Sequence, residues 1–217
     1  MDRRQFGLGA LAAGTTLAGA GVPRPARAAP VRIRVGWVVV PASLAPLVLQ
    51  QKELLTHFGK SYTAEAIHFE GTPPVITALA AGEVDIGPLA FSSFALAIQN
   101  AHMDDLRVIS DEIQDGVPGH GTNEFMVLKD GPIKKVADLK GKVLATNAMG
   151  SAVDISMRAM CKRSGLEANR DYTIIEAPFP AMRAMLAEKK ADLISAVPPF
   201  SLDPNLRGIA NTLFTEK

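Results

Sequence analysis

Residues 79–86 read LAAGEVDI and residues 186–193 read LAEKKADL, and the two stretches share one pattern. Each begins with the apolar end of a predicted helix, passes through a short polar turn, and reaches an aspartate that precedes an apolar strand. A stretch with strand character lies upstream of each copy, at residues 31–40 and 142–146, and a helix follows each. The chain therefore repeats a strand–helix–strand unit, which predicts two α/β lobes built on parallel sheets.

Helix-start signals support this organisation. A helix is expected from residue 43 to about residue 54, and further helices are expected after residues 72, 151 and 180. The residues that carry these signals are Ser43, Thr72 followed by Pro73, Ser151 followed by Asp154, and Pro180. Gly165 with Leu166 predicts a Schellman-type end for the helix that holds Cys161.

The N-terminus has the three parts of an export signal. Arg3 and Arg4 stand in a charged start, residues 7–22 carry no charge, and an Ala-Arg-Ala end closes at Ala28. The Arg-Arg-x-Phe order resembles twin-arginine signals, and a general secretory signal is the alternative. The apolar region is too short and glycine-rich for a membrane span, so we expect no membrane insertion after cleavage.

Charge and cysteine content exclude several classes of function. The signal holds four arginines and one aspartate, so the remaining 189 residues carry 19 basic and 21 acidic side chains. This near-neutral balance lacks the excess of basic residues that binds nucleic acid, and the sequence has no polybasic stretch of the kind that binds anionic lipid. Cys161 is the single cysteine, so no intrachain disulfide forms, and its place in a predicted helix favours a buried thiol over a reactive one.

Four segments in order carry a resemblance to a known family. They are residues 33–37 (IRVGW), 78–87 (ALAAGEVDIG), 136–143 (VADLKGKV) and 191–200 (ADLISAVPPF). Together they resemble the periplasmic solute-binding proteins of ABC importers for nitrate, sulfonates, taurine and related compounds, a group that is also similar to thiamine-pyrimidine precursor synthases. The resemblance implies a type II-like periplasmic-binding-protein fold, with two lobes around a cleft that close on a ligand without catalysis.

The resemblance also implies a domain plan. Residues 1–28 form the signal, residues 29–128 form the first lobe, and residues 129–200 form the second. Members of the family are longer, and their chain returns from the second lobe to complete the first. We therefore expect residues 201–217 to begin such a return in a chain that is cut short. The expected partners are a small-molecule ligand and an ABC permease with its ATPase, and the protein is expected to be a monomer.

Ligands of open parallel sheets bind beyond the carboxyl ends of the strands. This rule selects four loops as the predicted binding site, residues 37–43, 89–93, 147–151 and 197–200. Two of these loops start helices with small hydroxyl residues, and a helix N-terminus with about half a positive charge suits an anion, although such serines also serve as plain caps. The single tryptophan either stacks on a ligand or fills the core. The candidate residues are Trp37, Val40, Pro41, Phe91, Ser92, Ser93, Asn147, Gly150, Ser151, Pro198 and Phe200.

No catalytic, metal or cofactor motif stands out. The four histidines, His57, His68, His102 and His120, have no metal-ligand spacing to each other or to the cysteine. No arginine lies in the four loops, which disfavours a bidentate clamp on nitrate or sulfate and favours a larger ligand with apolar parts. Two alternatives stay open, an enzyme related to thiamine-pyrimidine synthesis and a ligand-sensing module. The synthases use a cysteine-rich motif, and a single cysteine argues against the first.

Overall fold

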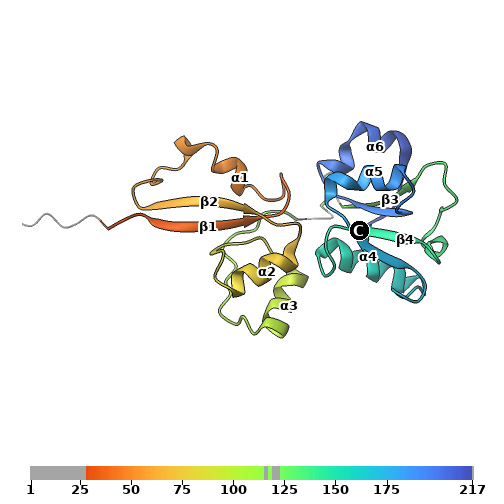
Figure 1. Cartoon of the computed structure of the whole chain (residues 1–217), viewed down its shortest axis with the longest axis horizontal. Coiled ribbons are helices and arrows are strands. Elements are labelled where there is room, and N and C mark those ends of the chain that lie inside the picture. The colour runs from red at the N-terminus through yellow and green to blue at the C-terminus, as the bar shows by residue number, and fades with distance from the viewer. Residues whose placement is uncertain (1–27, 115–116, 119–122, 217) are drawn as a thin grey trace, which may run out of the picture.

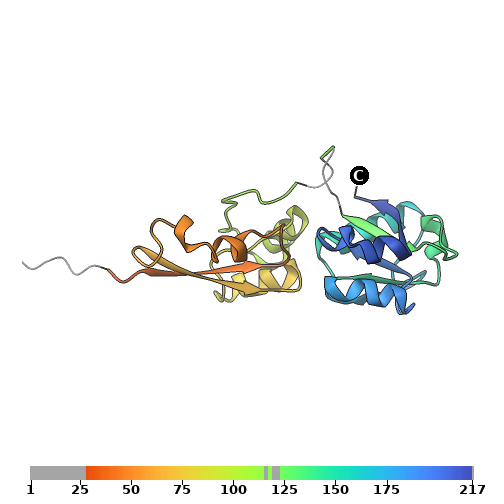
Figure 2. The same ribbon diagram turned by 90° about the horizontal axis from the view of Figure 1, so that it is seen from above.

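A computed structural model describes residues 28–114, 117–118 and 123–216. The predicted signal lies outside the described residues except for Ala28. The described chain forms two α/β lobes that lie side by side along the long axis of the molecule (Figures 1 and 2). We call residues 28–114 lobe 1 and residues 123–216 lobe 2. Among the described residues, no helix is long and apolar enough to cross a membrane.

Lobe 1 is built on a two-stranded parallel sheet. Strands β1 (Val31–Trp37) and β2 (Tyr62–His68) pair in register, and their carboxyl ends point toward lobe 2 (Figure 1). The repeat's first apolar strand is reduced to a single parallel bridge between Val35 and Ile86. The helical elements of lobe 1 are α1 (Ala45–Val48), η1 (Lys52–Leu54), α2 (Thr72–Ala80) and α3 (Phe91–Ala101).

Lobe 2 is built on a five-stranded mixed sheet in the order β5-β4-β6-β3-β7. The parallel sheet predicted for this lobe is present as β5, β4 and β6, whereas β3 and β7 run antiparallel to their neighbours. The strands are β3 (Glu124–Leu128), β4 (Val143–Thr146), β5 (Thr173–Glu176), β6 (Leu193–Ala196) and β7 (Ala210–Thr215). The helical elements are η2 (Val136–Leu139), α4 (Ala152–Arg163), η3 (Phe179–Ala181), α5 (Met182–Ala187), η4 (Phe200–Leu202) and α6 (Pro204–Ile209).

The sheet of lobe 2 separates two apolar clusters. The first includes Leu144, Leu193 and, from α4, Met157 and Cys161. The second includes Ala145 and Ile194, which point to the opposite face toward α5 and α6. Cys161 is fully buried, and burial raises the pKa of its thiol, as expected for a packing residue.

The repeat found in the sequence is also a repeat of hydrogen bonds. Gly82 and Lys189 occupy matching positions, and both have a positive φ, of 66° and 56°. Each ends its helix with the two bonds of a Schellman motif, from Gly82 and Glu83 in the first copy and from Lys189 and Lys190 in the second.

An aspartate completes each copy. The Asp85 carboxylate accepts the backbone N–H of Arg34 at 2.7 Å, and the Asp192 carboxylate accepts the backbone N–H of Val143 at 2.9 Å. In return, the N–H of each aspartate donates to the carbonyl of the same partner residue. Each copy therefore ties the end of its helix to the preceding strand by the same bonds.

Three local predictions are corrected by the structure. The first strand ends at Trp37 rather than at residue 40. The helix expected from residue 43 to residue 54 is two short pieces, because the buried hydroxyl of Ser43 accepts the N–H of Val38 instead of capping a helix. Thr72 is the first residue of α2 and not its cap, and its hydroxyl bonds with that of Ser93.

The position of β3 also differs from the prediction. The domain plan placed residues up to 128 in the first lobe, whereas β3 pairs with β6 and β7 inside the sheet of lobe 2. The chain therefore crosses between the lobes before Glu124. Pairing with the last strand, β7, explains why the local sequence of β3 did not reveal its lobe, because that contact is about 90 residues distant along the chain.

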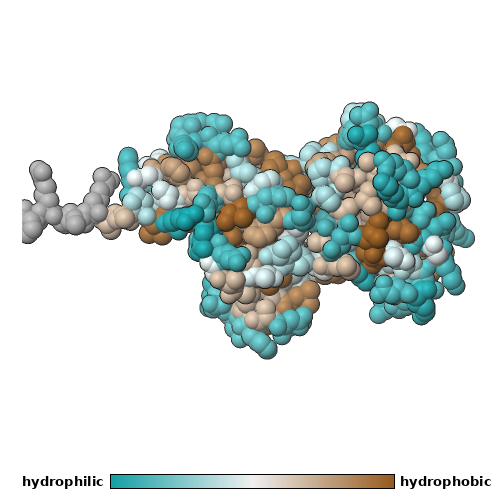
Figure 3. All heavy atoms as spheres, in the orientation of Figure 1, coloured by the Kyte–Doolittle hydropathy of each residue, from teal (hydrophilic) through white to brown (hydrophobic). Residues whose placement is uncertain are grey.

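Apolar side chains are covered less completely in lobe 1 than in lobe 2. Of the twelve exposed large hydrophobic residues in the described chain, ten belong to lobe 1 and two, Met149 and Leu202, belong to lobe 2. Figure 3 shows brown apolar surface on both lobes. A two-stranded sheet covers less apolar surface than a five-stranded sheet with helices on both faces, which accounts for this difference.

Lys189→Gly is expected to stabilise the protein. A non-glycine residue in the left-handed region costs about 1 kcal/mol, and Gly82 shows that the matching turn accepts glycine. The melting temperature should rise by about 2–4 °C. Lys190→Gly, at a neighbouring exposed position without positive φ, is the control and should give no increase. An unchanged melting temperature for Lys189→Gly would contradict the prediction.

Acid sensitivity is expected to depend on Asp85. The Arg34 guanidinium bonds to its carboxylate and lowers its pKa from 3.8 to about 2. A lowered folded pKa stabilises the protein above the unfolded pKa, and this contribution is lost as the pH falls from about 4 through 2. Denaturant unfolding of Asp85→Asn should show lower stability at pH 7 and a flatter decline in that window. Asp105→Asn, at an exposed position, is the control. Its stability should decline with falling pH as steeply as that of the unchanged chain.

Candidate functional site

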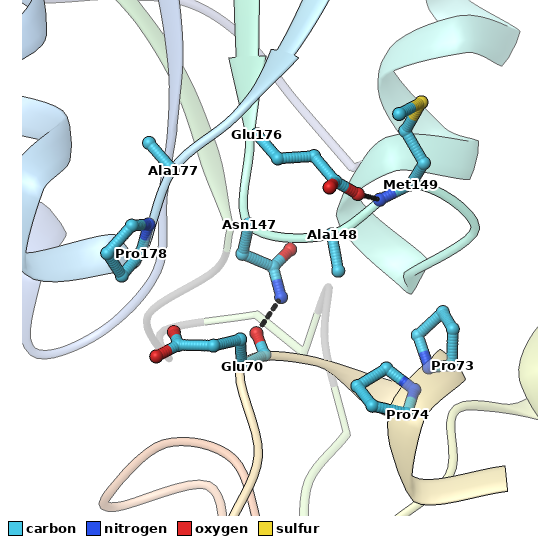
Figure 4. A pocket seen from close by; sticks show the side chains of 9 residues that line it. All are labelled: Glu70, Pro73, Pro74, Asn147, Ala148, Met149, Glu176, Ala177 and Pro178. Atoms are coloured by element: carbon cyan, nitrogen blue, oxygen red, sulfur yellow. Dashed lines mark hydrogen bonds between the residues drawn. The ribbon is translucent and has the colours of Figure 1, made fainter. Parts of the chain in front are cut away.

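The two lobes meet where α2 of lobe 1 begins and β4 of lobe 2 ends. The Asn147 side chain donates from Nδ2 to the main-chain oxygen of Glu70 at 2.7 Å (Figure 4). Gly71 allows this approach, because a Cβ there would lie 2.7 Å from the Cβ of Ala148 and 2.9 Å from Nδ2 of Asn147. The contact is direct and leaves no space for a side chain at residue 71.

A pocket of about 330 Å³ lies beside this contact and is lined by both lobes. Its walls follow the carboxyl ends of β2, β4 and β5, which is where α/β proteins bind ligands. Lobe 1 contributes Glu70, Pro73 and Pro74, and lobe 2 contributes Asn147, Ala148, Met149, Glu176, Ala177 and Pro178 (Figure 4). The volume is that of a site for a small molecule.

The polar groups of the pocket are acidic or neutral. Glu70 and Glu176 supply two carboxylates, Asn147 supplies an amide, and no basic residue is in the lining. Glu176 also accepts the backbone N–H of Met149, which fixes the loop after β4 against the end of β5 (Figure 4). The rest of the lining is apolar, so the pocket combines negative charge with apolar walls.

The start of α4, predicted as an anion site, is satisfied by the protein itself. Ser151 is the N-cap and accepts the N–H of Asp154, as predicted, and its hydroxyl donates to Asn147. The carboxylate of Asp154, 2% exposed, accepts the N–H of Gly150 and pairs with Arg158. Asp154 therefore puts a negative charge of the protein itself at the start of α4, which disfavours a bound anion there.

At the start of α3, also predicted as a binding site, a serine hydroxyl is likewise bonded within the protein. Ser92 and Ser93 lie within the first turn of the helix, which begins at Phe91. Ser93 is fully buried, and its hydroxyl bonds with that of Thr72 at 2.7 Å. This bond between the two hydroxyls joins the starts of α2 and α3 within lobe 1. Phe91 is 90% exposed.

The remaining predicted residues lie outside the pocket lining. Trp37 packs on His68 with ring centroids 4.4 Å apart, and Phe200 stacks with Phe179 at 6.2 Å. Gly150 has a φ of 81°, and a Cβ there would be 3.6 Å from Pro73 of lobe 1. Of the eleven candidates, the structure brings Asn147 into the pocket, while Val40, Pro41 and Pro198 follow strand ends elsewhere on the two lobes. Contact of these residues with a ligand stays a prediction.

Sequence reasoning missed Glu70 and Glu176 because it missed their strands. The same rule of strand carboxyl ends would have found both, since Glu70 follows β2 by two residues and Glu176 is the last residue of β5. Alternation in residues 62–68 and the short apolar run at 173–176 were the available signals. Among the described residues, no group of three or more His, Cys, Asp or Glu side chains could hold a metal, and His120 lies outside them.

Comparison with known proteins now identifies the family. The sequence model described as NMT1/THI5 like matches residues 75–199, which is more than half of the chain. The chain belongs to the NMT1/THI5-like family. No curated protein matches the chain by sequence. The matched range of this NMT1/THI5-like chain includes both copies of the repeat and the pocket residues of lobe 2.

Solved structures confirm the type II-like two-lobe fold. The alkanesulfonate-binding protein SsuA from Xanthomonas axonopodis pv. citri, bound to MOPS, has 25% identity and a TM-score of 0.65, with 88% of this chain and 62% of that chain covered. The periplasmic aliphatic sulphonate binding protein SsuA from Escherichia coli has 21% identity and a TM-score of 0.59, with 86% and 61% covered. The periplasmic nitrate-binding protein NrtA from Synechocystis PCC 6803 has 13% identity and a TM-score of 0.61, with 86% and 51% covered.

This NMT1/THI5-like chain thus spans about half to three fifths of the length of these relatives. All three are binding proteins.

Gly71→Ala is expected to destabilise the contact between the lobes. The added Cβ would overlap Ala148 and Asn147, and overpacking of this kind lowers the free energy of unfolding by about 1–3 kcal/mol. Denaturant unfolding measures the change. Gly208→Ala is the control, because a Cβ there meets no atom and alanine favours the α6 helix. Equal stability of Gly71→Ala and the unchanged chain would contradict the prediction.

Proposed function

We propose that the protein is the periplasmic substrate-binding component of an ABC importer. It captures a small anionic or organic solute of the sulfonate, nitrate or taurine class between its lobes and delivers it to a membrane permease with its ATPase. The observation that carries this proposal is the pocket walled by strand ends of both lobes. A ligand in that place contacts both lobes and stabilises their closed arrangement.

Export is part of the proposal. Residues 1–28 direct the chain to the periplasm through a twin-arginine signal, and the mature protein acts there as a monomer. The described residues offer no membrane-spanning helix. The periplasmic sulphonate-binding protein of Escherichia coli and the periplasmic nitrate-binding protein of Synechocystis support the same location.

The charges that line the pocket favour some solutes of this class over others. Two carboxylates and no basic residue line it, so a positive or amino-bearing group is favoured there and a bare oxyanion such as nitrate is disfavoured. The apolar proline, alanine and methionine walls favour a solute with a carbon chain. A taurine-like solute, with an amino group and a sulfonate on a short chain, meets both conditions.

The enzyme alternative has little support in the structure. Cys161, the single cysteine, is fully buried in the apolar cluster under α4 and lies away from the pocket lining. A cysteine-rich motif like that of the thiamine-pyrimidine synthases is absent from the sequence.

Calorimetric titration with taurine, ethanesulfonate, nitrate and benzoate tests the proposal. We expect taurine to bind most tightly and nitrate most weakly. Glu176→Gln keeps the acceptor for Met149 but removes the charge. It should weaken taurine binding about two- to fivefold, whereas binding of ethanesulfonate, which has no amino group, should not weaken. Glu53→Gln, exposed in η1, is the matched control. Absence of heat with all four compounds would count against the function itself.

A further inference from the structure

Three buried hydroxyl groups of lobe 2 have no hydrogen-bond partner among the residues that the structure describes. They belong to Thr146, Ser195 and Ser201, whose exposed fractions are 0%, 1% and 1%. A buried polar group without a partner costs about 1–3 kcal/mol. Three such groups in one lobe therefore call for a reason beyond packing.

Two of the three lie at the carboxyl ends of parallel strands in the sheet of lobe 2, and the third lies in the helical turn that follows one of these strands. Thr146 is the last residue of β4, Ser195 is the third of four residues in β6, and Ser201 is in η4, the turn that follows β6. These are carboxyl ends of parallel strands, where α/β proteins bind ligands. Thr146 is also the direct neighbour of Asn147, which lines the pocket.

The strand register places two of the hydroxyls together. In the parallel pairing of β4 and β6, Leu144 lies beside Leu193 and Ala145 beside Ile194, so the next pair is Thr146 and Ser195. Side chains alternate along a strand, so this pair shares the face of Leu144 and Leu193, which is the face covered by α4. Neighbouring strands are about 5 Å apart, a spacing that one small group can span.

Lobe 1 closes over the same region. Val39, from the loop after β1, packs against the apolar cluster that includes Leu144, Leu193 and Val197. Separation of the lobes would withdraw this side chain from the carboxyl ends of β4 and β6.

We propose that Thr146, Ser195 and Ser201 are ligand-binding residues of lobe 2, and that they donate to an acceptor-rich head group, such as the sulfonate or carboxylate of a small organic acid. Each hydroxyl has a proton to donate, and none has an acceptor within residues 28–114, 117–118 and 123–216. The nearby Asp154 carboxylate is paired with Arg158, so it does not oppose an anionic head group as a free charge would. The inference rests on the proposed function and adds the residues that hold one end of the solute.

Hydroxyl deletions in the full chain test the assignment. Thr146→Val and Ser195→Ala should each weaken binding of ethanesulfonate and taurine about tenfold, the value of one hydrogen bond to a charged group. Thr146→Ser keeps the hydroxyl and should bind within about twofold of the unchanged chain. Thr173→Val, at an exposed position of β5, is the control for hydroxyl loss on a strand and should also bind normally.

Stability provides the second measurement. Because the deleted hydroxyls have no partner in the described part of the chain, Thr146→Val and Ser195→Ala should melt at the same temperature as the unchanged chain or higher. A fall of more than about 4 °C would reveal a structural bond and overturn the inference. Unchanged binding in both variants would overturn it while leaving the proposed function intact. Failure of the unchanged chain to bind any compound would instead overturn the proposed function, and the inference with it.

Discussion

An aspartate carboxylate ties each helix of the repeat to the strand that precedes it. Asp85 exchanges two hydrogen bonds with the backbone of Arg34, and Asp192 does the same with Val143. These bonds fix the register between the strand and the segment after the helix. In lobe 2 the bonded residue, Val143, is the first of β4, so the anchor is at the far end of the strand from the pocket. The carboxyl ends are left to the loops that meet the other lobe.

Features that depend on neighbouring residues could be predicted from the sequence. The repeat, the cap at Ser151 and the Schellman end at Gly165 are all local, and each is present. The helix from residue 43 was wrong because the Ser43 hydroxyl has a better partner in Val38, a contact made only after the chain turns back. Likewise, β3 could be assigned to its lobe only through strands that come about 70 to 90 residues later.

Prediction of the site residues was limited in the same way, because part of the site depends on contacts that form only in the folded chain. Asn147 was predicted because it follows a strand with an obvious apolar pattern, whereas Glu70 and Glu176 follow strands that are short or partly exposed. The start of α4 had the sequence of an anion site. The N–H of Gly150, just before this helix, nevertheless donates to the carboxylate of Asp154, the third residue of the helix, and only the folded geometry shows that this carboxylate turns back. A carboxylate in the first turn can thus remove the very site that the turn would offer.

The bond between the lobes is asymmetric in a way that affects how the protein tolerates sequence change. Its donor is a side chain, Asn147, but its acceptor is the main-chain oxygen of Glu70. Every amino acid carries that oxygen, so drift at residue 70 can alter the charge of the pocket without breaking the contact. Residue 147 has no such freedom. Substitutions at residue 70 can therefore change which solutes the pocket attracts, while the hydrogen bond between the lobes keeps its geometry.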